Sequence, residues 1–256
     1  MARLGHLLQI ASAAGFLASG ALFAITRPDD PRLASPMPAL DALTTGLPLP
    51  RIEGPFLPHL FLNPQNIVMW ALLMSIWVAV ATDALGQLTD PSEGAGRRRL
   101  AAVVRLRVWP MLVPALLLAA LWPWLLEPAP RIAGVMAVAA ALLAFLAAWR
   151  GVAQRRPALG FLAGWSVGLA SATLAAQIAA PAGMSLAQMA TLAILPAAGS
   201  GVAAQILLGR GIGVSVALIW AFCGLAMTTM GVSPMTAIAA ILAIVVMAAV
   251  LVSAAS

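Results

Sequence analysis

The sequence contains no lysine and no tyrosine, and it has one cysteine and two histidines among 256 residues. Without lysine no Schiff base to retinal or pyridoxal can form, which excludes a photoreceptor of the rhodopsin type. The cysteine, Cys223, cannot form an intrachain disulfide, and its apolar surroundings predict a small buried hydrophobe. The histidines, His6 and His59, lie far apart, so the sequence offers no cluster of histidine, cysteine and carboxylate for a metal ion.

Charge is also scarce. Only 9% of the residues are charged and 62% are hydrophobic, whereas a soluble domain carries about 25% charged residues. The apolar residues form runs of roughly 20, the length that crosses a bilayer as a helix. The sequence therefore predicts an all-α protein, a polytopic bundle of transmembrane helices.

Eight apolar runs qualify as spans. They cover Leu7 to Ile25, Ile67 to Gly86, Trp109 to Leu126, Ile132 to Trp149, Leu159 to Ala180, Leu186 to Leu208, Gly213 to Met230 and Met235 to Ser253. The first run follows Arg3 and resembles a signal peptide, but we expect it to be retained as a helix. The sixth and seventh runs are separated only by the residues GRGIG (209–213), where we predict a tight turn.

The arginines predict the orientation, because loops on the cytoplasmic side carry an excess of positive charge. With eight spans and an inner N-terminus, ten arginines fall on the inner side and four on the outer side. The inner ones are Arg3, Arg97, Arg98, Arg99, Arg105, Arg107, Arg150, Arg155, Arg156 and Arg210, and the outer ones are Arg27, Arg32, Arg51 and Arg131. This bias predicts that both termini are cytoplasmic.

Two long loops complete the predicted topology. The outer loop, residues 26–66, is rich in proline, which favours extended and turn structure over helix. We expect it to form a cap, with its apolar part, Gly54 to Pro64, dipping to the membrane interface. Between the second and third spans, the arginine-rich inner loop is expected to meet anionic lipid headgroups, each arginine contributing about 1 kcal/mol.

Eight tryptophans are present. Trp109, Trp122, Trp124 and Trp149 stand at the ends of expected spans, where an aromatic belt meets the lipid headgroups. The remaining candidates for a function, Trp70, Trp165 and Trp220, lie a few residues inside their spans. Two interpretations stay open for these three: further belt positions, or the lining of a common cavity.

Glycines recur at every fourth position of the fifth span, at Gly160, Gly164 and Gly168. Such a row lies on one helix face and lets a second backbone approach closely, either within the chain or in a homodimer. Trp165 follows Gly164 by one residue, which places it about 100° around the helix from the glycines. We expect Trp165 to border that packed face without belonging to it.

Polar residues inside a membrane are costly. Asp83 is the one carboxylate within an expected span, near its cytoplasmic end. It is interpreted as an end residue that pairs with arginine, with a proton-relay group as the alternative. The amides of Asn63, Asn66, Gln177 and Gln188 lie near the outer ends of spans, whereas Gln205 lies within the sixth. Those near the outer ends would form a polar rim above an apolar pocket, or all five would make hydrogen bonds between helices.

Three segments resemble TspO, the family of tryptophan-rich sensory or translocator proteins. NPQNIVMWALLM (63–74) is similar to the start of the second family helix, LLLAALWPW (116–124) to the third, and FLAGWSVGLASAT (161–173) to the fifth. In a longer bacterial branch of the family, VALIWAFCGLA (216–226) also has a counterpart.

This resemblance implies a five-helix bundle that binds porphyrins and other flat apolar ligands in an aromatic pocket. Residues 1–180 would be that bundle, and residues 181–256 would add three transmembrane helices. Trp70 and Trp165 would line the pocket, to which we add Trp220, Asn66 and Gln177 as candidate ligand-binding residues. The resemblance implies a location in the bacterial inner membrane, a porphyrin or other tetrapyrrole as ligand, and no covalently bound cofactor.

A second interpretation assigns the protein to a larger membrane complex instead of to ligand binding. The sequence shows no paired carboxylates at mid-membrane, no histidine–serine or cysteine–histidine set and no phosphate-binding loop, so we do not expect an enzyme. Small-residue faces and methionine-rich spans suit an accessory or assembly subunit of a larger photosynthetic or respiratory membrane complex equally well. A transporter would need a central polar path, which the sequence lacks, and the basic charge indicates lipid contact instead of nucleic acid.

Overall fold

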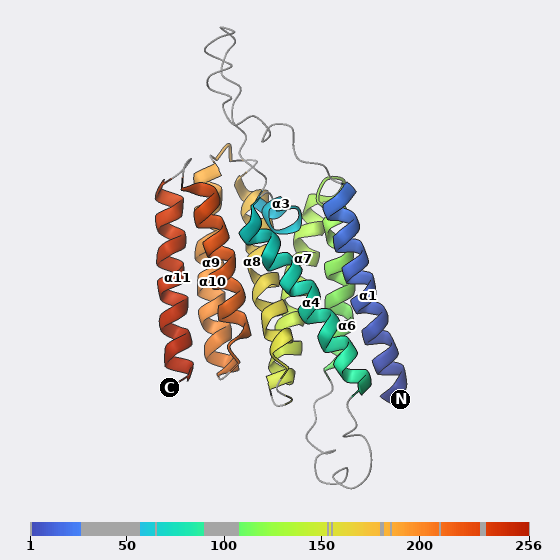
Figure 1. Ribbon diagram of the computed structural model, residues 1–256. Helices are drawn as coiled ribbons and strands as arrows, with labels where there is room; N and C mark the ends of the chain where they lie inside the picture. Colours follow the sequence, from blue (N-terminus) through green and yellow to red (C-terminus); the bar gives the residue numbers. More distant parts are fainter. Residues whose placement is uncertain are drawn as a thin grey trace.

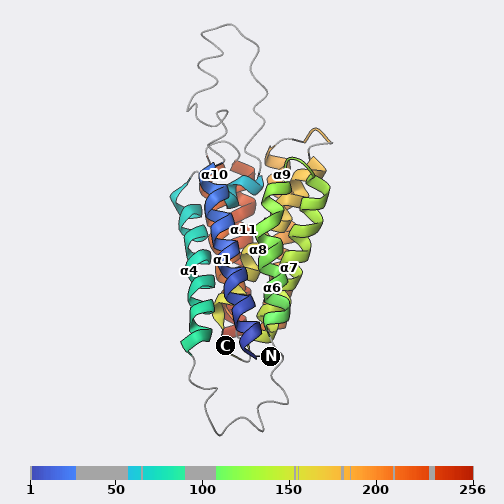
Figure 2. The same cartoon turned by 90° about the vertical axis from the view of Figure 1, so that its right-hand side faces the viewer.

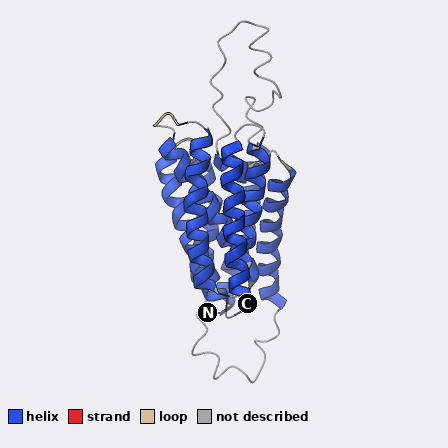
Figure 3. Cartoon of the chain, turned by 90° about the vertical axis from the view of Figure 1, so that its left-hand side faces the viewer, coloured by secondary structure: helices blue, strands red, loops and turns tan. Residues whose placement is uncertain are grey.

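The structure is a computed structural model that describes residues 2–26, 57–64, 66–89, 108–152, 154, 156–179, 182–184, 186–209, 211–230 and 234–255. Helices account for nearly all of these residues, and Figure 3 shows no strand among them. Most of the proline-rich outer loop and of the arginine-rich inner loop lies outside the described ranges, so the expectations for a cap and for headgroup contacts remain predictions.

The helices follow the apolar runs. They are α1 (Ala2–Thr26), α3 (Leu57–Leu62), α4 (Ile67–Thr89), α6 (Trp109–Leu121), the 3-10 helix η2 (Trp122–Leu125), α7 (Pro130–Val152), α8 (Pro157–Ala179), α9 (Leu186–Leu208), α10 (Gly213–Thr229) and α11 (Pro234–Ala255). Six of them are long and apolar enough to cross a membrane, and Trp109–Leu125 and Gly213–Thr229 are shorter apolar helices. The predicted class, a helical bundle suited to a membrane, is confirmed.

The helices run side by side in one bundle, with the N- and C-termini at the same end (Figures 1 and 2). α1 lies at one edge and α11 at the opposite edge (Figure 1). Between them, α8 packs against α4, α7, α9 and α10, and 78% of its apolar window is buried. The three C-terminal helices therefore join the same bundle as the preceding ones.

The glycine row of α8 explains how this helix fits at the centre. A Cβ atom built on Gly164 would lie 2.5 Å from the Val214 carbonyl oxygen, and one on Gly160 would lie 3.3 Å from the Gly213 Cα. The backbones of α8 and α10 thus touch directly, as small residues permit in a membrane. Because α10 covers these two glycines, they do not offer a free surface for a homodimer.

The turn GRGIG separates α9 from α10 as predicted. α9 ends at Leu208, Gly209 takes a positive φ of 57°, and α10 begins at Gly213. Gln205 is fully buried next to this turn, where its amide donates to the Gly209 carbonyl (2.8 Å) and accepts from the Ser215 hydroxyl (2.7 Å). This side chain satisfies polar groups that the end of a helix otherwise leaves unpaired.

Within the apolar segment before α4, residues 57–62 form α3, whose Leu57 and Phe61 are buried, and α3 packs against α8. The expected approach of this segment to the membrane interface stays a prediction.

Two other expectations need correction. Trp122 does not belong to an aromatic belt, because it is 1% exposed and faces the interior. The proline beside it, Pro123, cannot donate a backbone hydrogen bond, and α6 gives way to the tighter η2 at this point. Cys223 is half-buried instead of buried.

Candidate ligand-binding site

Trp165 occupies the interior of the bundle. It is 2% exposed, and its ring meets the ring of Phe16 on α1 edge to face at a centroid distance of 5.9 Å and an angle of 74°. The glycines of α8 face α10 and α3, whereas Trp165 faces α1, which agrees with the angular offset expected from the sequence.

A small void adjoins Trp165 and lies between α6, η2, α7 and α8. Its lining residues are Ala119, Trp122, Ala137, Ala140, Trp165, Ser166, Leu169 and Ala170. The void has no room for a water molecule. Two indole rings and a wall of alanines surround it.

The indole Nε1 of Trp165 is buried and has no hydrogen-bond partner among the residues that the structure describes, as is also true of Trp77 on α4. A buried tryptophan N–H usually finds an acceptor, and leaving one unpaired costs about 1–3 kcal/mol. The α7 alanines that line the void, Ala137 and Ala140, offer no side-chain acceptor. This N–H is consequently a hydrogen-bond donor that is available to an acceptor atom in an otherwise apolar interior.

The other two candidate tryptophans lie elsewhere. Trp220 on α10 donates from Nε1 to the Val68 carbonyl on α4 at 2.9 Å, and its ring meets Phe161 edge to face at 6.3 Å. Trp70 is partly buried on α4. Neither residue lines the void beside Trp165, so the structure does not bring the three tryptophans together there.

The amides also make separate links. Asn66 donates to the Thr228 hydroxyl at 2.6 Å, and its side-chain oxygen accepts from the backbone N–H of Met69 at 2.8 Å. It thereby caps the start of α4 and ties that helix to α10. Gln177 donates to the Pro130 carbonyl and joins the outer part of α8 to α7. These contacts favour hydrogen bonding between helices over a common polar rim.

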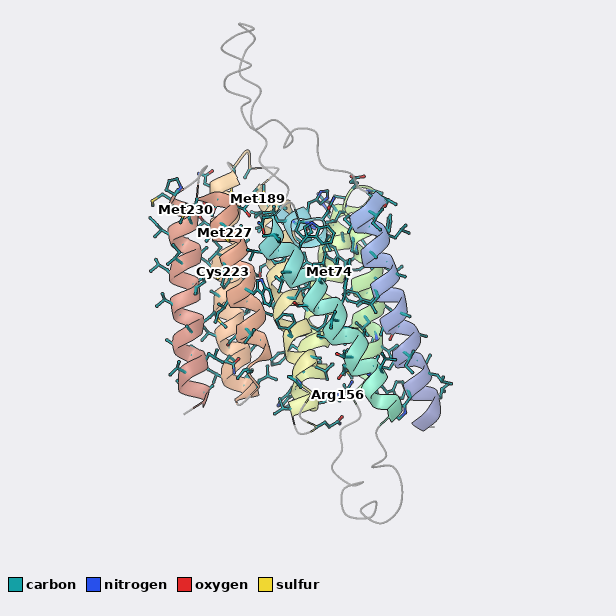
Figure 4. All side chains as sticks on the ribbon, viewed as in Figure 1. Met74, Arg156, Met189, Cys223, Met227 and Met230 are labelled. Atoms are coloured by element: carbon teal, nitrogen blue, oxygen red, sulfur yellow. The ribbon has the colours of Figure 1, made fainter. Side chains whose placement is uncertain are left out.

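Asp83 is held by an ion pair, as the first interpretation of this residue predicts. Arg156 donates from Nε to Asp83 Oδ1 at 2.8 Å and from Nη2 to Oδ2, and both side chains are 8% exposed. Gln9 on α1 donates a further hydrogen bond to Asp83 Oδ2 at 3.3 Å. Figure 4 shows Arg156 at the end of the bundle where the termini lie.

Sequence reasoning missed Gln9 and could not choose the arginine. Gln9 is 3% exposed, and a buried amide in a lipid-spanning helix is the signal that could have marked it. Next to this cluster is a narrow cleft between α1, α4, α6 and α8 with room for about one water molecule. Its lining residues are Gln9, Ala13, Val80, Asp83, Ala84, Leu112, Leu116, Ala158, Leu159 and Leu162.

Comparison with known proteins gives no relative. No protein-family model matches the chain, and no curated protein or solved structure matches it. The fold and the contacts described above place the chain in the class of multi-pass helical membrane proteins. The resemblance to TspO rests on the sequence segments alone.

Proposed function

We propose that this protein is an integral membrane protein of TspO type that binds a flat apolar ligand, such as a tetrapyrrole, beside Trp165 without catalysing a reaction. The observation that carries the proposal is the unpartnered indole N–H of Trp165 next to this small void. A ligand with an acceptor nitrogen or oxygen would satisfy this donor, and its ring would stack on tryptophan.

Ligand binding requires the void to widen, because it has no room even for a water molecule. Ala137 and Ala140 of α7 contribute one methyl group each to the wall. In a bilayer no hydrophobic force holds α7 against α8, because lipid is as apolar as the helix surface. A flat ring inserted between α7 and α8 would replace methyl contacts with ring contacts, and aromatic stacking adds roughly 0.5–1.5 kcal/mol.

Eight crossings of the bacterial inner membrane, with both termini in the cytoplasm, fit this role. The two shorter helices pack within the same bundle as the six long ones, and the termini share one end (Figure 1). Arg150 lies in the last turn of α7 and Arg156 follows its end, both on the terminus side, whereas Arg131 stands at the opposite end of α7. More arginine on the terminus side is the pattern of a cytoplasmic side.

Titration of the purified protein with a porphyrin tests the function. Binding should quench tryptophan fluorescence in a saturable manner, with one porphyrin per chain, and native mass spectrometry from mild detergent should show the same stoichiometry. Absence of any porphyrin binding by the folded wild-type protein would contradict the ligand role.

A specific surface favours the second candidate function, an accessory or assembly subunit of a photosynthetic or respiratory membrane complex. On α9, Gly199, Ser200 and Ala203 are exposed, and a Cβ atom built on Gly199 would meet nothing within 4 Å. Small residues on a lipid-facing helix let a helix of another protein approach closely. Co-purification with a large pigment or respiratory complex, lost on Gly199→Leu, would support this role.

A further inference from the structure

The polar cluster of Asp83, Arg156 and Gln9 joins three separate parts of the chain at one end of the bundle. Asp83 belongs to α4, Gln9 to α1, and Arg156 to the short connection between α7 and α8. Asp83 and Gln9 also line the narrow cleft described above. The cluster therefore fixes the walls of this cleft relative to one another.

The cleft and the void beside Trp165 follow one another along the same helices. α1, α6 and α8 all begin at the end of the bundle that holds the termini (Figure 1), so rising residue numbers lead inward on each. Phe16, whose ring contacts Trp165, lies one turn beyond Ala13 of the cleft. On α6, Ala119 of the void lies three residues beyond Leu116 of the cleft.

The third helix shows the same order. On α8, Leu159 and Leu162 line the cleft, and Trp165 and Ser166 line the void. Residues three and four apart share a helix face, so a single face of each helix passes from the cleft to the void. About one helical turn, roughly 5.4 Å, separates the two spaces.

We propose that the Asp83–Arg156 pair, with Gln9, is a gate at the mouth of a route that leads from the terminus side to Trp165. That the void is a ligand site rests on the proposed function. The gate itself rests only on the cleft and the void lying one after the other along the same helices. While the two parallel hydrogen bonds hold, Arg156, immediately before α8, stays against α4 and the cleft stays narrow. When Asp83 and Arg156 separate, α4 can move away from the start of α8. Leu162 and Phe16, which lie between the cleft and the void, can then move apart and connect the two spaces.

Cysteine labelling tests the gate without any ligand. Ser166 lines the void and is 5% exposed, so Ser166→Cys in a Cys223→Ala background reports on access for a water-soluble methanethiosulfonate reagent. Asp83→Asn should raise the labelling rate roughly tenfold or more, the effect of losing charge-assisted hydrogen bonds. Arg156→Lys, which keeps the charge but not the two parallel bonds, should give a smaller increase.

A matched position and a charge exchange serve as controls. Ser171 is also buried on α8, at 8% exposure, and belongs to the lining of neither space, so Ser171→Cys should label slowly in every variant. Exchanging the charges, Asp83→Arg with Arg156→Asp, should restore slow labelling of Ser166→Cys. Equal acceleration at both positions, or no acceleration in a folded Asp83→Asn or Arg156→Lys protein, would overturn the gate.

The two proposals fail in different ways. Gated labelling in a protein that binds no porphyrin would leave the gate standing and remove the ligand. The opposite result is also possible: the protein binds porphyrin, but Asp83→Asn changes neither the association rate nor the labelling rate of Ser166→Cys. That result would keep the ligand site and remove the gate.

Discussion

Gly164 of α8 and Val214 of α10 lie so close that a Cβ atom on Gly164 would stand 2.5 Å from the Val214 carbonyl oxygen. The approach joins the fifth apolar run to the seventh, so it holds the C-terminal helices to the rest of the bundle. Backbone atoms cannot move aside as a flexible side chain can, and any larger residue at position 164 must push the helices apart.

Gly164→Leu should therefore destabilise the protein by about 1–3 kcal/mol or more, the usual cost of overpacking. Thermal unfolding in detergent, followed by circular dichroism, measures the loss. Gly15→Leu is the matched control, because a Cβ atom on this exposed glycine of α1 meets nothing within 4 Å. Equal stability of the two variants would show that α8 and α10 are not packed this closely.

Gln205→Ala should weaken the junction of α9 and α10. The change leaves the Ser215 hydroxyl and the Gly209 carbonyl without the partner that Gln205 provides, at a cost of about 1–3 kcal/mol for a buried polar group. Gln188→Ala, at an exposed side chain of the same helix, should change the melting temperature much less. The comparison would contradict the role of Gln205 if both substitutions had the same small effect.

The Asp83–Arg156 pair predicts a non-additive result. Removing one partner, as in Asp83→Leu, should destabilise the protein by up to about 3–5 kcal/mol, because the other charge is left buried and unpaired. Replacing both, with Asp83→Leu and Arg156→Met, should restore most of the stability, since apolar residues suit this environment. A double variant as unstable as the sum of the single ones would show that the two side chains act independently.

Topology gives a prediction that involves no ligand. A reporter fused after Ser256 should be cytoplasmic, and one inserted near Leu43 should be periplasmic. The shared end of the termini places both on one side of the bundle, and the arginine bias favours the cytoplasm for that side. A periplasmic C-terminus together with a periplasmic reporter at Leu43 would mean that one of the two shorter helices does not cross the membrane.

The sequence predicts the helices and the pairing of Asp83 with an arginine because both depend on local properties. Apolar runs of membrane length predict the helices to within a few residues. A carboxylate inside such a run needs a partner of opposite charge, as Asp83 has. The identity of the partner depends on the fold: Asp83 and Arg156 are 73 residues apart, and ten arginines were assigned to the same side.

Two features that the sequence did not predict, the burial of Trp122 and the helix α3, have physical causes of the same kind. Trp122 stands at the end of a span, which is typical of a belt residue, but its depth alone does not say whether it faces lipid or α8. The helix α3 has six residues, too few to display helical periodicity. Its burial follows from the position of α8 behind it, which only the assembled bundle reveals.

The last prediction concerns Trp165. Trp165→Ala removes both the ring and the indole N–H, so it should weaken porphyrin binding by the stacking contribution of roughly 0.5–1.5 kcal/mol or more. Trp165→Phe keeps an aromatic face but loses the N–H, so it should keep the stacking contribution and lose that of the hydrogen bond, with an affinity between those of the wild type and Trp165→Ala. Trp149, 56% exposed on α7, does not line the void, and Trp149→Ala should leave binding unchanged. Fluorescence titration in one detergent measures all three, and equal losses at Trp165 and Trp149 would remove the ligand site from the interior and favour the subunit role.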